Sequence, residues 1–453
     1  RRLVPVGTRA LSRCFATIDF PSLSIKSSAN DFCHQTMMTN SSSSHTRQAW
    51  ILVVGLGVVM AISFGISFNA FSIFTLPIVD AFGASLEQAA RIATVFMITM
   101  TLTMPAAGWL LDHAPPRPVM TLGAVVTALG YVLAAHSDSL TLFTAAIGLA
   151  GVGVGASTYV PAFTLVTRWM SPRRQGLAFG VLLAVTAIGG IFFPILLTRM
   201  IAAFGLRDTL QVCAAMVFFI CLPLLLWLVR LPPPGLHAAE QAAADAGTKG
   251  GIGKALCMPR YWLWVGMFLL ITLSSLSILM GLVPYLVSVG YTADAAALIY
   301  GTLAAAAIVG SLLFGALSTR WGAGRTLVLG VILASMGMAC LLVAPHPSFG
   351  VLALVLFVLI GGTTFNLVNQ FSPTLLMELI GQRNFGSLLG IGNLISGLGA
   401  AMGPTLFGYL VDSTRSYVLP LSLSAAMMAL ALLPLIMLLR SPRLPRAALV
   451  VPS

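Results

Sequence analysis

The sequence predicts an all-α membrane protein with twelve transmembrane helices in two pseudo-symmetric six-helix halves. Hydrophobic residues make up 58% of the chain, charged residues only 8%, and the mean hydropathy is +0.98. Soluble domains carry roughly 25% charged residues, so this composition excludes them. Twelve apolar segments reach the length of about 20 residues that a spanning helix needs. A pattern of Gly, Pro and Arg residues also occurs twice, half a chain apart.

The twelve segments lack the alternating pattern of a membrane β-barrel and are therefore expected to be helices. We place them at 51–76, 90–111, 118–135, 141–166, 176–200, 207–229, 262–287, 294–317, 324–344, 349–373, 385–409 and 417–439. The 43 glycines and 25 prolines suit helices that pack closely and bend where neighbours satisfy the backbone.

The internal repeat is defined by residues that recur at a fixed offset. Five of them recur 210 positions later: Arg173, Gly176, Gly180, Gly189 and Pro194 as Arg383, Gly386, Gly390, Gly399 and Pro404. Three more recur 207 positions later: Pro77, Gly83 and Gly108 as Pro284, Gly290 and Gly315. The repeat is half the chain and too long for a solenoid unit. Two copies in one membrane protein predict a transporter with its site between the halves.

The net charge of +12 predicts topology rather than nucleic-acid binding, because the basic residues are distributed unevenly over the loops. From Arg47 onward, the side that holds both termini has fifteen Lys and Arg residues and the other side has four. Basic loops stay in the cytoplasm, so we expect both termini there, in a multi-pass protein of the cell (inner or plasma) membrane. Attraction to anionic lipid is a secondary effect of the same charges.

The chain outside the spans is divided by composition. Residues 1–46 are rich in Ser and Thr and are expected to be a disordered tail. The first methionine is Met37, so we expect the native start there and regard residues 1–36 as an upstream extension. We expect six-helix bundles at 47–230 and 260–440, a partly helical cytoplasmic linker at 231–259, and a cytoplasmic tail at 441–453.

The predicted helix interiors contain essentially no Asp, Glu, Lys, Arg or His. Buried charges in a bilayer are costly and are usually kept for function, so their absence indicates a site made of neutral polar groups. The candidate substrate-binding residues are Asn69, Tyr159, Ser274, Ser275, Tyr285, Asn366, Asn369, Gln370 and Asn393. The alternative for each residue is that it holds neighbouring helices together. The sequence shows no metal-ligand spacing and no nucleophile–base pair in the helices. We therefore expect that the protein binds no metal or cofactor and is not an enzyme.

Several motifs resemble those of one transporter family. The loop between helices 2 and 3 carries Gly108, Asp112 and Arg117, with a degenerate second copy at Gly315, Arg320 and Arg325. These motifs and the two six-helix halves resemble the major facilitator superfamily over residues 47–440. The stretch RWMSPRRQGLAFG at Arg168–Gly180 is similar to the signature of its monocarboxylate and oxalate/formate branch. The resemblance implies the major facilitator fold and a small organic substrate.

The chain departs from that family pattern at some positions. Pro115 replaces a glycine of the loop 2–3 motif, and Thr319 replaces the acidic residue of its second copy. Branch members often carry an Arg in helix 8 or a basic residue in helix 11 that meets a carboxylate. Here helix 8 has no basic residue, and Asn393 is the most polar residue in the middle of helix 11.

Asp112 is the charged residue that is easiest to interpret. The resemblance and the repeat imply that it faces the N-terminus of helix 11 near Arg383–Gly386, where the helix dipole favours a carboxylate. We expect a gating cluster that latches the cytoplasmic side in the outward-open state. Its members are Asp112, Arg117, Arg168, Arg173 and Arg383. The alternative is that Asp112 is a solvated loop charge.

We therefore expect a monomeric secondary transporter that moves a small organic solute by alternating access. A monocarboxylate or related organic acid is the favoured substrate, and a proton could be transported with it by symport. An exporter of a neutral or amphipathic compound is an alternative. A membrane receptor that does not transport is a further one, although it would predict a soluble domain.

Overall fold

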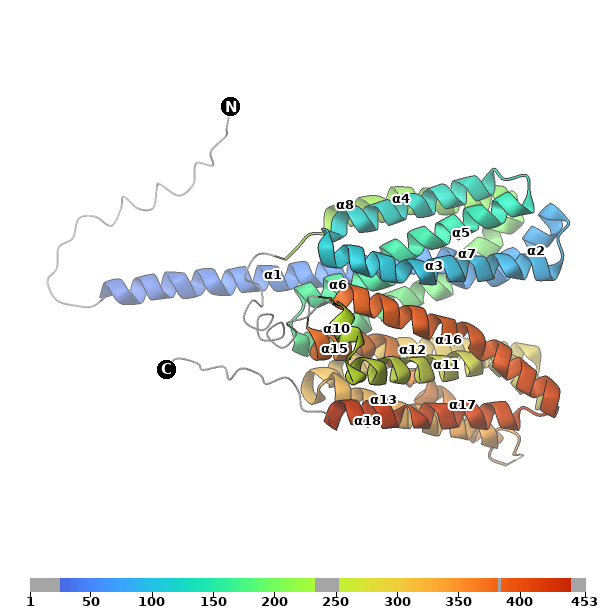
Figure 1. Cartoon of the computed structure of the whole chain (residues 1–453). Coiled ribbons are helices and arrows are strands. Elements are labelled where there is room, and N and C mark those ends of the chain that lie inside the picture. Colours follow the sequence, from blue (N-terminus) through green and yellow to red (C-terminus); the bar gives the residue numbers. More distant parts are fainter. Residues whose placement is uncertain (1–24, 233–251, 347, 382–383, 441–453) are drawn as a thin grey trace. The chain divides into compact units, whose positions relative to one another are not determined.

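The computed structural model describes residues 25–232, 252–346, 348–381 and 384–440 (Figure 1). In these parts of the chain, eleven helices are long and apolar enough to cross a membrane. The prediction of an all-α membrane protein is confirmed. Contacts between residues divide the described chain into two units, one up to Gln48 and the other from Ala49 onward. The second unit holds both predicted bundles, so these are packed together in one body.

The helices of the first half cover the predicted segments, but a break divides each of the segments 51–76 and 141–166. Their bounds are α1 (Ile25–Ile66), η1 (Phe68–Ala70), α2 (Phe71–Phe82), α3 (Leu86–His113), α4 (Pro116–Ala135), α5 (Leu140–Ser157), α6 (Tyr159–Trp169), α7 (Pro172–Met216), η2 (Val217–Cys221) and α8 (Leu222–Leu228). Here η1 is a 3₁₀-helix and η2 a π-helix.

The second half repeats this order after a short helix in the linker. Its elements are α10 (Ile252–Leu256), α11 (Pro259–Ser288), α12 (Ala293–Trp321), α13 (Ala323–Val343), α14 (Gly350–Leu356), η3 (Phe357–Gly362, a π-helix), α15 (Leu367–Ile380), α16 (Phe385–Thr414), α17 (Val418–Leu430) and α18 (Leu432–Arg440). Most of the predicted linker and all of the predicted tail at 441–453 lie outside the described residues.

The longest apolar stretch, Pro172–Leu228, has 57 residues. A straight helix of this length would measure about 85 Å, almost three times the hydrocarbon thickness of about 30 Å. Gly205 interrupts the helix with φ 81° and ψ 178°, a conformation open to glycine. The two parts match the predicted fifth and sixth spans, and twelve as the total number of spans stays a prediction.

The structure differs from the sequence prediction in the N-terminal tail. Residues 25–46, expected to be disordered, form part of helix α1. Helix nucleation is costly, but extension adds one hydrogen bond for each residue that is fixed. The apolar first span therefore supplies a helical nucleus that the preceding Ser-rich and Thr-rich segment can continue.

Helix ends lie where the local sequence provides caps and breaks. Ser85 and Gln88 form a capping box at the start of α3, and Thr292 caps α12 through a hydrogen bond from the backbone of Ala295. Gly83 and Gly290, equivalent in the repeat, both have positive φ just after a helix, 59° and 104°. The repeat therefore extends to the backbone geometry of the helix ends.

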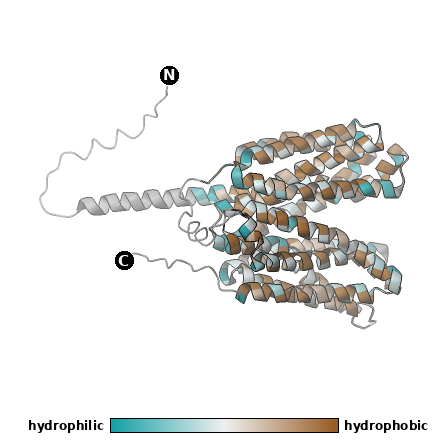
Figure 2. Cartoon of the chain, in the orientation of Figure 1, coloured by the Kyte–Doolittle hydropathy of each residue, from teal (hydrophilic) through white to brown (hydrophobic). Residues whose placement is uncertain are grey.

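Apolar side chains cover the outside of the helices of residues 49–440. Exposed examples are Leu76, Phe219, Leu298 and Val351, each 67–73% accessible. Figure 2 shows hydrophobic residues along the length of the helices and hydrophilic ones mainly at their ends. A soluble protein would not expose so much apolar surface, whereas lipid tails cover it without cost.

Small residues allow helices of one half to approach closely. At the α4–α5 contact, a Cβ on Gly130 would lie 2.5 Å from the backbone nitrogen of Ala150 and 2.8 Å from the oxygen of Ala146. Backbone atoms cannot rotate away as a side chain can. The absence of a side chain at Gly130 therefore sets the spacing of these helices.

We expect Gly130→Ala to destabilise the protein by about 1–3 kcal/mol, because the added methyl group overpacks a backbone contact. The measurement is thermal unfolding of the purified protein in detergent. Gly266→Ala in α11 is the matched control, because a Cβ there has no neighbour within 4 Å. Equal melting temperatures for the two variants would contradict a tight α4–α5 contact.

Candidate functional site

The most extensive contacts between the two halves are two helix crossings, α3 with α16 and α7 with α12. Both crossings lie toward the end of the bundle where α3, α6 and α12 finish and α7 and α16 begin. We call this the basic end, because the helix turns that end or begin here carry Arg117, Arg173, Arg174 and Arg320. The sequence predicts that this end is cytoplasmic.

Glycine backbones form the core of each crossing. A Cβ on Gly108 in α3 would collide with the carbonyl oxygen of Gly386 in α16. At the other crossing, a Cβ on Gly315 in α12 would lie 3.2 Å from the carbonyl oxygen of Gly176 in α7. Along α3 and α16 the close approach extends to Thr101 and Gly397.

Asp112 lies at the N-terminus of α16, where the repeat and the family resemblance place it. One carboxylate oxygen accepts a hydrogen bond from the backbone N–H of Gly386 at 3.0 Å. The other accepts from the backbone N–H of Ser387 at 2.8 Å and from its hydroxyl at 2.6 Å. Charge-assisted bonds of this kind are about twice as strong as neutral ones, and the helix dipole adds to them. The carboxylate therefore joins the two halves.

Arg168 supports this contact from within the first half. Its guanidinium donates to the carbonyl oxygen of Leu111 at 2.8 Å, beside Asp112. Arg117 and Arg173 are exposed, and Arg383 lies outside the described residues. In the described parts of the chain, the side-chain ion pairs are Glu87–Arg91 and Asp138–Arg207. Among the described residues, Asp112 is thus held by helix N–H groups and a hydroxyl rather than by a direct salt bridge.

The interacting hydroxyl of Ser387 was not predicted from the sequence. The available signal was its position immediately after Gly386 at the start of a helix, where a short polar side chain can reach an incoming carboxylate. The repeat gives no hint of it, because the equivalent residue in the first half is Leu177.

Three candidate residues from the two halves meet deeper in the bundle. The Tyr159 hydroxyl of α6 donates to the backbone oxygen of Asn369 in α15 at 3.1 Å. The Gln370 side-chain nitrogen donates to the backbone oxygens of Gly176 at 2.8 Å and of Ser311 at 2.9 Å. Gln370 is completely buried, whereas Asn369 and Asn366 are partly exposed.

Several helices that carry candidate residues are interrupted beside those residues. The backbone leaves helical geometry at Ser67 between α1 and η1 and at Thr158 between α5 and α6. In the second half, residues 365–366 form a turn between η3 and α15. Irregular backbone at membrane depth is tolerated where it is buried in protein or lines a cavity. Discontinuous helices are also the usual elements of transporter substrate sites.

Other candidates lie apart from this meeting point. The Ser274 hydroxyl donates to the Ser424 oxygen at 2.7 Å, and the Tyr285 hydroxyl donates to the Leu341 oxygen at 2.7 Å. Both are buried contacts within the second half, in contrast to the prediction that they line a cavity. Asn69 and Asn393 are partly exposed. Asn69 of η1 donates to the Phe64 oxygen of α1, and Asn393 donates to the Leu389 oxygen of its own helix.

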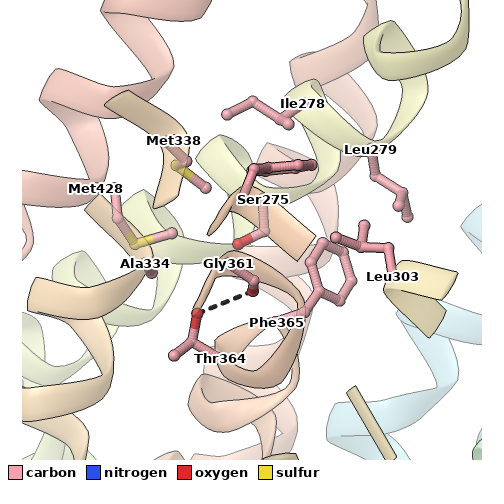
Figure 3. Close-up of a pocket in the computed structure, with 11 residues that line it drawn as sticks. Ser275, Ile278, Leu279, Leu303, Ala334, Met338, Gly361, Thr364, Phe365 and Met428 are labelled. Atoms are coloured by element: carbon pink, nitrogen blue, oxygen red, sulfur yellow. Dashed lines mark hydrogen bonds between the residues drawn. The ribbon is translucent and has the colours of Figure 1, made fainter. Parts of the chain in front are cut away.

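Ser275 borders a small pocket inside the second half (Figure 3). The pocket is lined by Ser275, Ile278, Leu279, Leu303, Ala334, Met338, Phe357, Gly361, Thr364, Phe365 and Met428. The Thr364 hydroxyl donates to the Gly361 oxygen of η3 at 2.9 Å. A free volume of about 20 Å³ accommodates one water-sized molecule. In this conformation the pocket is too small for an organic substrate.

The chain is similar to proteins of one known family. The model of the Major Facilitator Superfamily matches residues 56–404. Monocarboxylate transporter 13 of Rattus norvegicus is 27% identical over 373 residues, 81% of this chain and 83% of that protein. The oxalate:formate antiporter of Oxalobacter formigenes is 25% identical over 315 residues, 68% of this chain and 71% of that protein.

A solved structure shares the fold at low sequence identity. The fucose:proton symporter FucP of E. coli has a TM-score of 0.66 and 16% identity, and the match covers 86% of this chain and 98% of that one. The match supports the predicted two-half architecture.

We expect Asp112→Asn to open the basic end more often, because the variant loses charge-assisted hydrogen bonds to α16. The loss of roughly 1.5 kcal/mol corresponds to a tenfold change in the balance of conformations. The measurement is the rate of maleimide labelling of Met104→Cys in a variant with the native cysteines replaced. Met104 is 7% exposed, and its backbone oxygen lies against Gly390 in α16.

The matched control is Asp138→Asn. It removes an exposed carboxylate that lies far from the basic end and pairs with Arg207 at 2.9 Å. A labelling rate that rises equally in both variants would contradict a specific role for Asp112. An unchanged rate in Asp112→Asn would show that this carboxylate does not hold the halves together.

Proposed function

The chain belongs to the Major Facilitator Superfamily, and we propose that it is a secondary transporter of a small monocarboxylate or related organic acid that works by alternating access. One observation carries this proposal. Among the described residues, Asp112, Gln370 and Tyr159 form hydrogen bonds between the two halves. These bonds are distributed from the basic end to the level of the helix interruptions. A body closed at one end around interrupted helices is the arrangement expected for one state of such a cycle.

We place the basic end in the cytoplasm of a cell membrane, because basic loops are retained there. With this orientation the conformation is closed on the inside. The gate on that side consists of Asp112 with the α16 N-terminus, supported by Arg168, together with the glycine crossings. Arg117 and Arg173, in the first turns of α4 and α7, contribute positive charge around it. Arg383, which lies outside the described residues, stays a predicted member of the gating cluster.

The substrate site of this proposal lies at the level of the helix interruptions. Its candidate contacts are Asn69, Tyr159, Asn366, Asn369 and Asn393. These groups are neutral, so they can donate hydrogen bonds to carboxylate oxygens without providing a fixed positive charge. Tyr159 already donates to the opposite half at 3.1 Å, so substrate binding there competes with closure.

A neutral site has a consequence for coupling. A bare carboxylate loses hydration on entering it, and the candidate contacts that the structure describes there supply no cation to compensate for that loss. Transport of the acid together with a proton reduces the cost, because the pair is neutral overall. We therefore favour proton-linked movement, with the proton carried by the substrate or by a group exposed in another conformation.

The names of the relatives support the substrate class, since the Rattus norvegicus relative is a monocarboxylate transporter and the Oxalobacter formigenes relative an oxalate:formate antiporter. The uncharged site also favours a second candidate function, the export of a neutral or amphipathic compound. The two functions differ in whether a carboxylate is moved.

The test is counterflow in proteoliposomes with a panel of radiolabelled short monocarboxylates and neutral analogues at two pH values. We expect uptake of a carboxylate, faster at the lower pH. Movement of a neutral compound alone would replace the first proposal by the second.

Asn366→Ala is expected to raise the KM for that carboxylate by roughly tenfold, the effect of one lost hydrogen bond to a charged group. Ser335→Ala in α13 is the matched control, because its hydroxyl donates to Val331 of its own helix at 2.8 Å. An unchanged KM in Asn366→Ala would remove this residue from the site.

A further inference from the structure

The two glycine crossings are related by the internal repeat. Gly108 of α3 corresponds to Gly315 of α12, and Gly386 of α16 corresponds to Gly176 of α7. In the structure Gly108 meets Gly386, and Gly315 meets Gly176. The pseudo-symmetry therefore maps one contact between the halves onto the other. Polar groups that differ between the two crossings are then the features that require explanation.

The crossing of α3 with α16 is latched by Asp112, four residues after Gly108. The residue four positions after Gly315 is Thr319. Its hydroxyl donates to the Ala316 oxygen of its own helix at 2.7 Å, and its side chain is exposed. Thr319 therefore makes no equivalent link to α7 in this structure.

A side chain from a different helix occupies the second crossing. Gln370 of α15 places its amide nitrogen between the Gly176 oxygen of α7 and the Ser311 oxygen of α12, at 2.8 and 2.9 Å. A Cβ on Gly180 would lie 2.7 Å from this nitrogen, and one on Gly315 would lie 3.0 Å from it. These two glycines leave the space that the amide fills.

We propose that Gln370 is the second latch between the halves, a neutral counterpart of Asp112 at the pseudo-symmetric crossing. Its amide ties α7 of the first half to α12 and α15 of the second. The inference rests on the proposed alternating-access function, because a latch is useful only if the halves separate. It assigns Gln370 to closure of the basic end and not to direct contact with substrate.

The chemistry of Gln370 suits a contact that must break in every cycle. Its nitrogen uses both donor hydrogens, but its side-chain oxygen is buried and has no partner among the described residues. A buried unpaired acceptor offsets part of the gain from the two hydrogen bonds. Water that enters when the basic end opens would hydrate this oxygen, so opening costs less than the loss of two bonds suggests.

The experiment measures distances between spin labels at Arg174 and Trp321, which are exposed at the ends of the α7–α12 crossing. The labels are placed in the full-length protein in nanodiscs, with the native cysteines replaced and without substrate. Gln370→Met keeps the length of the side chain and removes both donors. We expect it to raise the ratio of long to short distances by about tenfold.

Three further variants make the result specific. Thr319→Ala, four residues after Gly315, is expected to leave the distances unchanged. Asp112→Asn is expected to lengthen them by disrupting the other latch. The double variant of Asp112 and Gln370 is expected to multiply the two changes in ratio, because the latches share no partner atoms.

Unchanged distances in Gln370→Met, in a preparation where Asp112→Asn lengthens them, would overturn the proposal. A change in Thr319→Ala equal to that in Gln370→Met would also overturn it. If Gln370→Met does not elute as a folded protein, Gln370→Asn tests the same point, because its amide is one methylene too short to reach both oxygens. The distances are measured without substrate, so they can be interpreted even if the uptake test finds no carboxylate transport. Normal carboxylate uptake together with unchanged distances would reject the latch and leave the proposed function intact.

Discussion

The close approach of glycine backbones between the halves is the contact on which the rest of the closed arrangement depends. Gly108 lies against Gly386, and Gly176 lies against Gly315. Only at this separation can the Asp112 carboxylate reach the first N–H groups of α16, and only then can the Gln370 amide reach two helices at once. The hydrogen bonds between the halves thus depend on the close packing of small residues. In a bilayer such packing has to replace the hydrophobic effect, which does not act between helices in lipid.

The two latches differ in charge because they are buried to different extents. Asp112 is partly exposed near the basic end, where backbone N–H groups and the helix dipole stabilise its charge, whereas Gln370 is completely buried. A second carboxylate at the position of Gln370 would face two carbonyl oxygens and would lack the N–H groups that surround Asp112. A neutral amide supplies donors there without the desolvation cost of a charge. The difference between the two crossings therefore follows from their different burial.

Interrupted helices connect this gate to the interior. The break at Thr158 directly precedes Tyr159, and the turn at residues 365–366 precedes Asn369 and Gln370 in α15. Residues that bond the two halves together therefore lie within one or two helical turns of the irregular backbone. A ligand that alters the backbone at these breaks would also alter the contacts between the halves. This proximity is a physical basis for coupling between an interior site and the gate.

Much of the fold was determined by the sequence alone. Apolar length and the glycine, proline and arginine repeat predicted the spans and the relation of the halves, because the bilayer leaves few other structures for such a chain. The position of Asp112 at the start of α16 was predicted from the family resemblance together with the repeat. The helical residues 25–46 were missed because composition alone does not show that a neighbouring helix continues into them.

The candidate site depended more on tertiary structure. Ser274, Tyr285, Gln370 and Asn393 look alike in sequence, as polar residues in apolar helices. Ser274 and Tyr285 bond within the second half, whereas Gln370 bonds across the halves. Which partner a side chain meets depends on how each helix is rotated and how closely its neighbours approach, and an apolar helix has no clear polar face that fixes its rotation. The sequence therefore determined that polar groups lie inside the membrane, and only the packing of the helices decided which of them join the two halves.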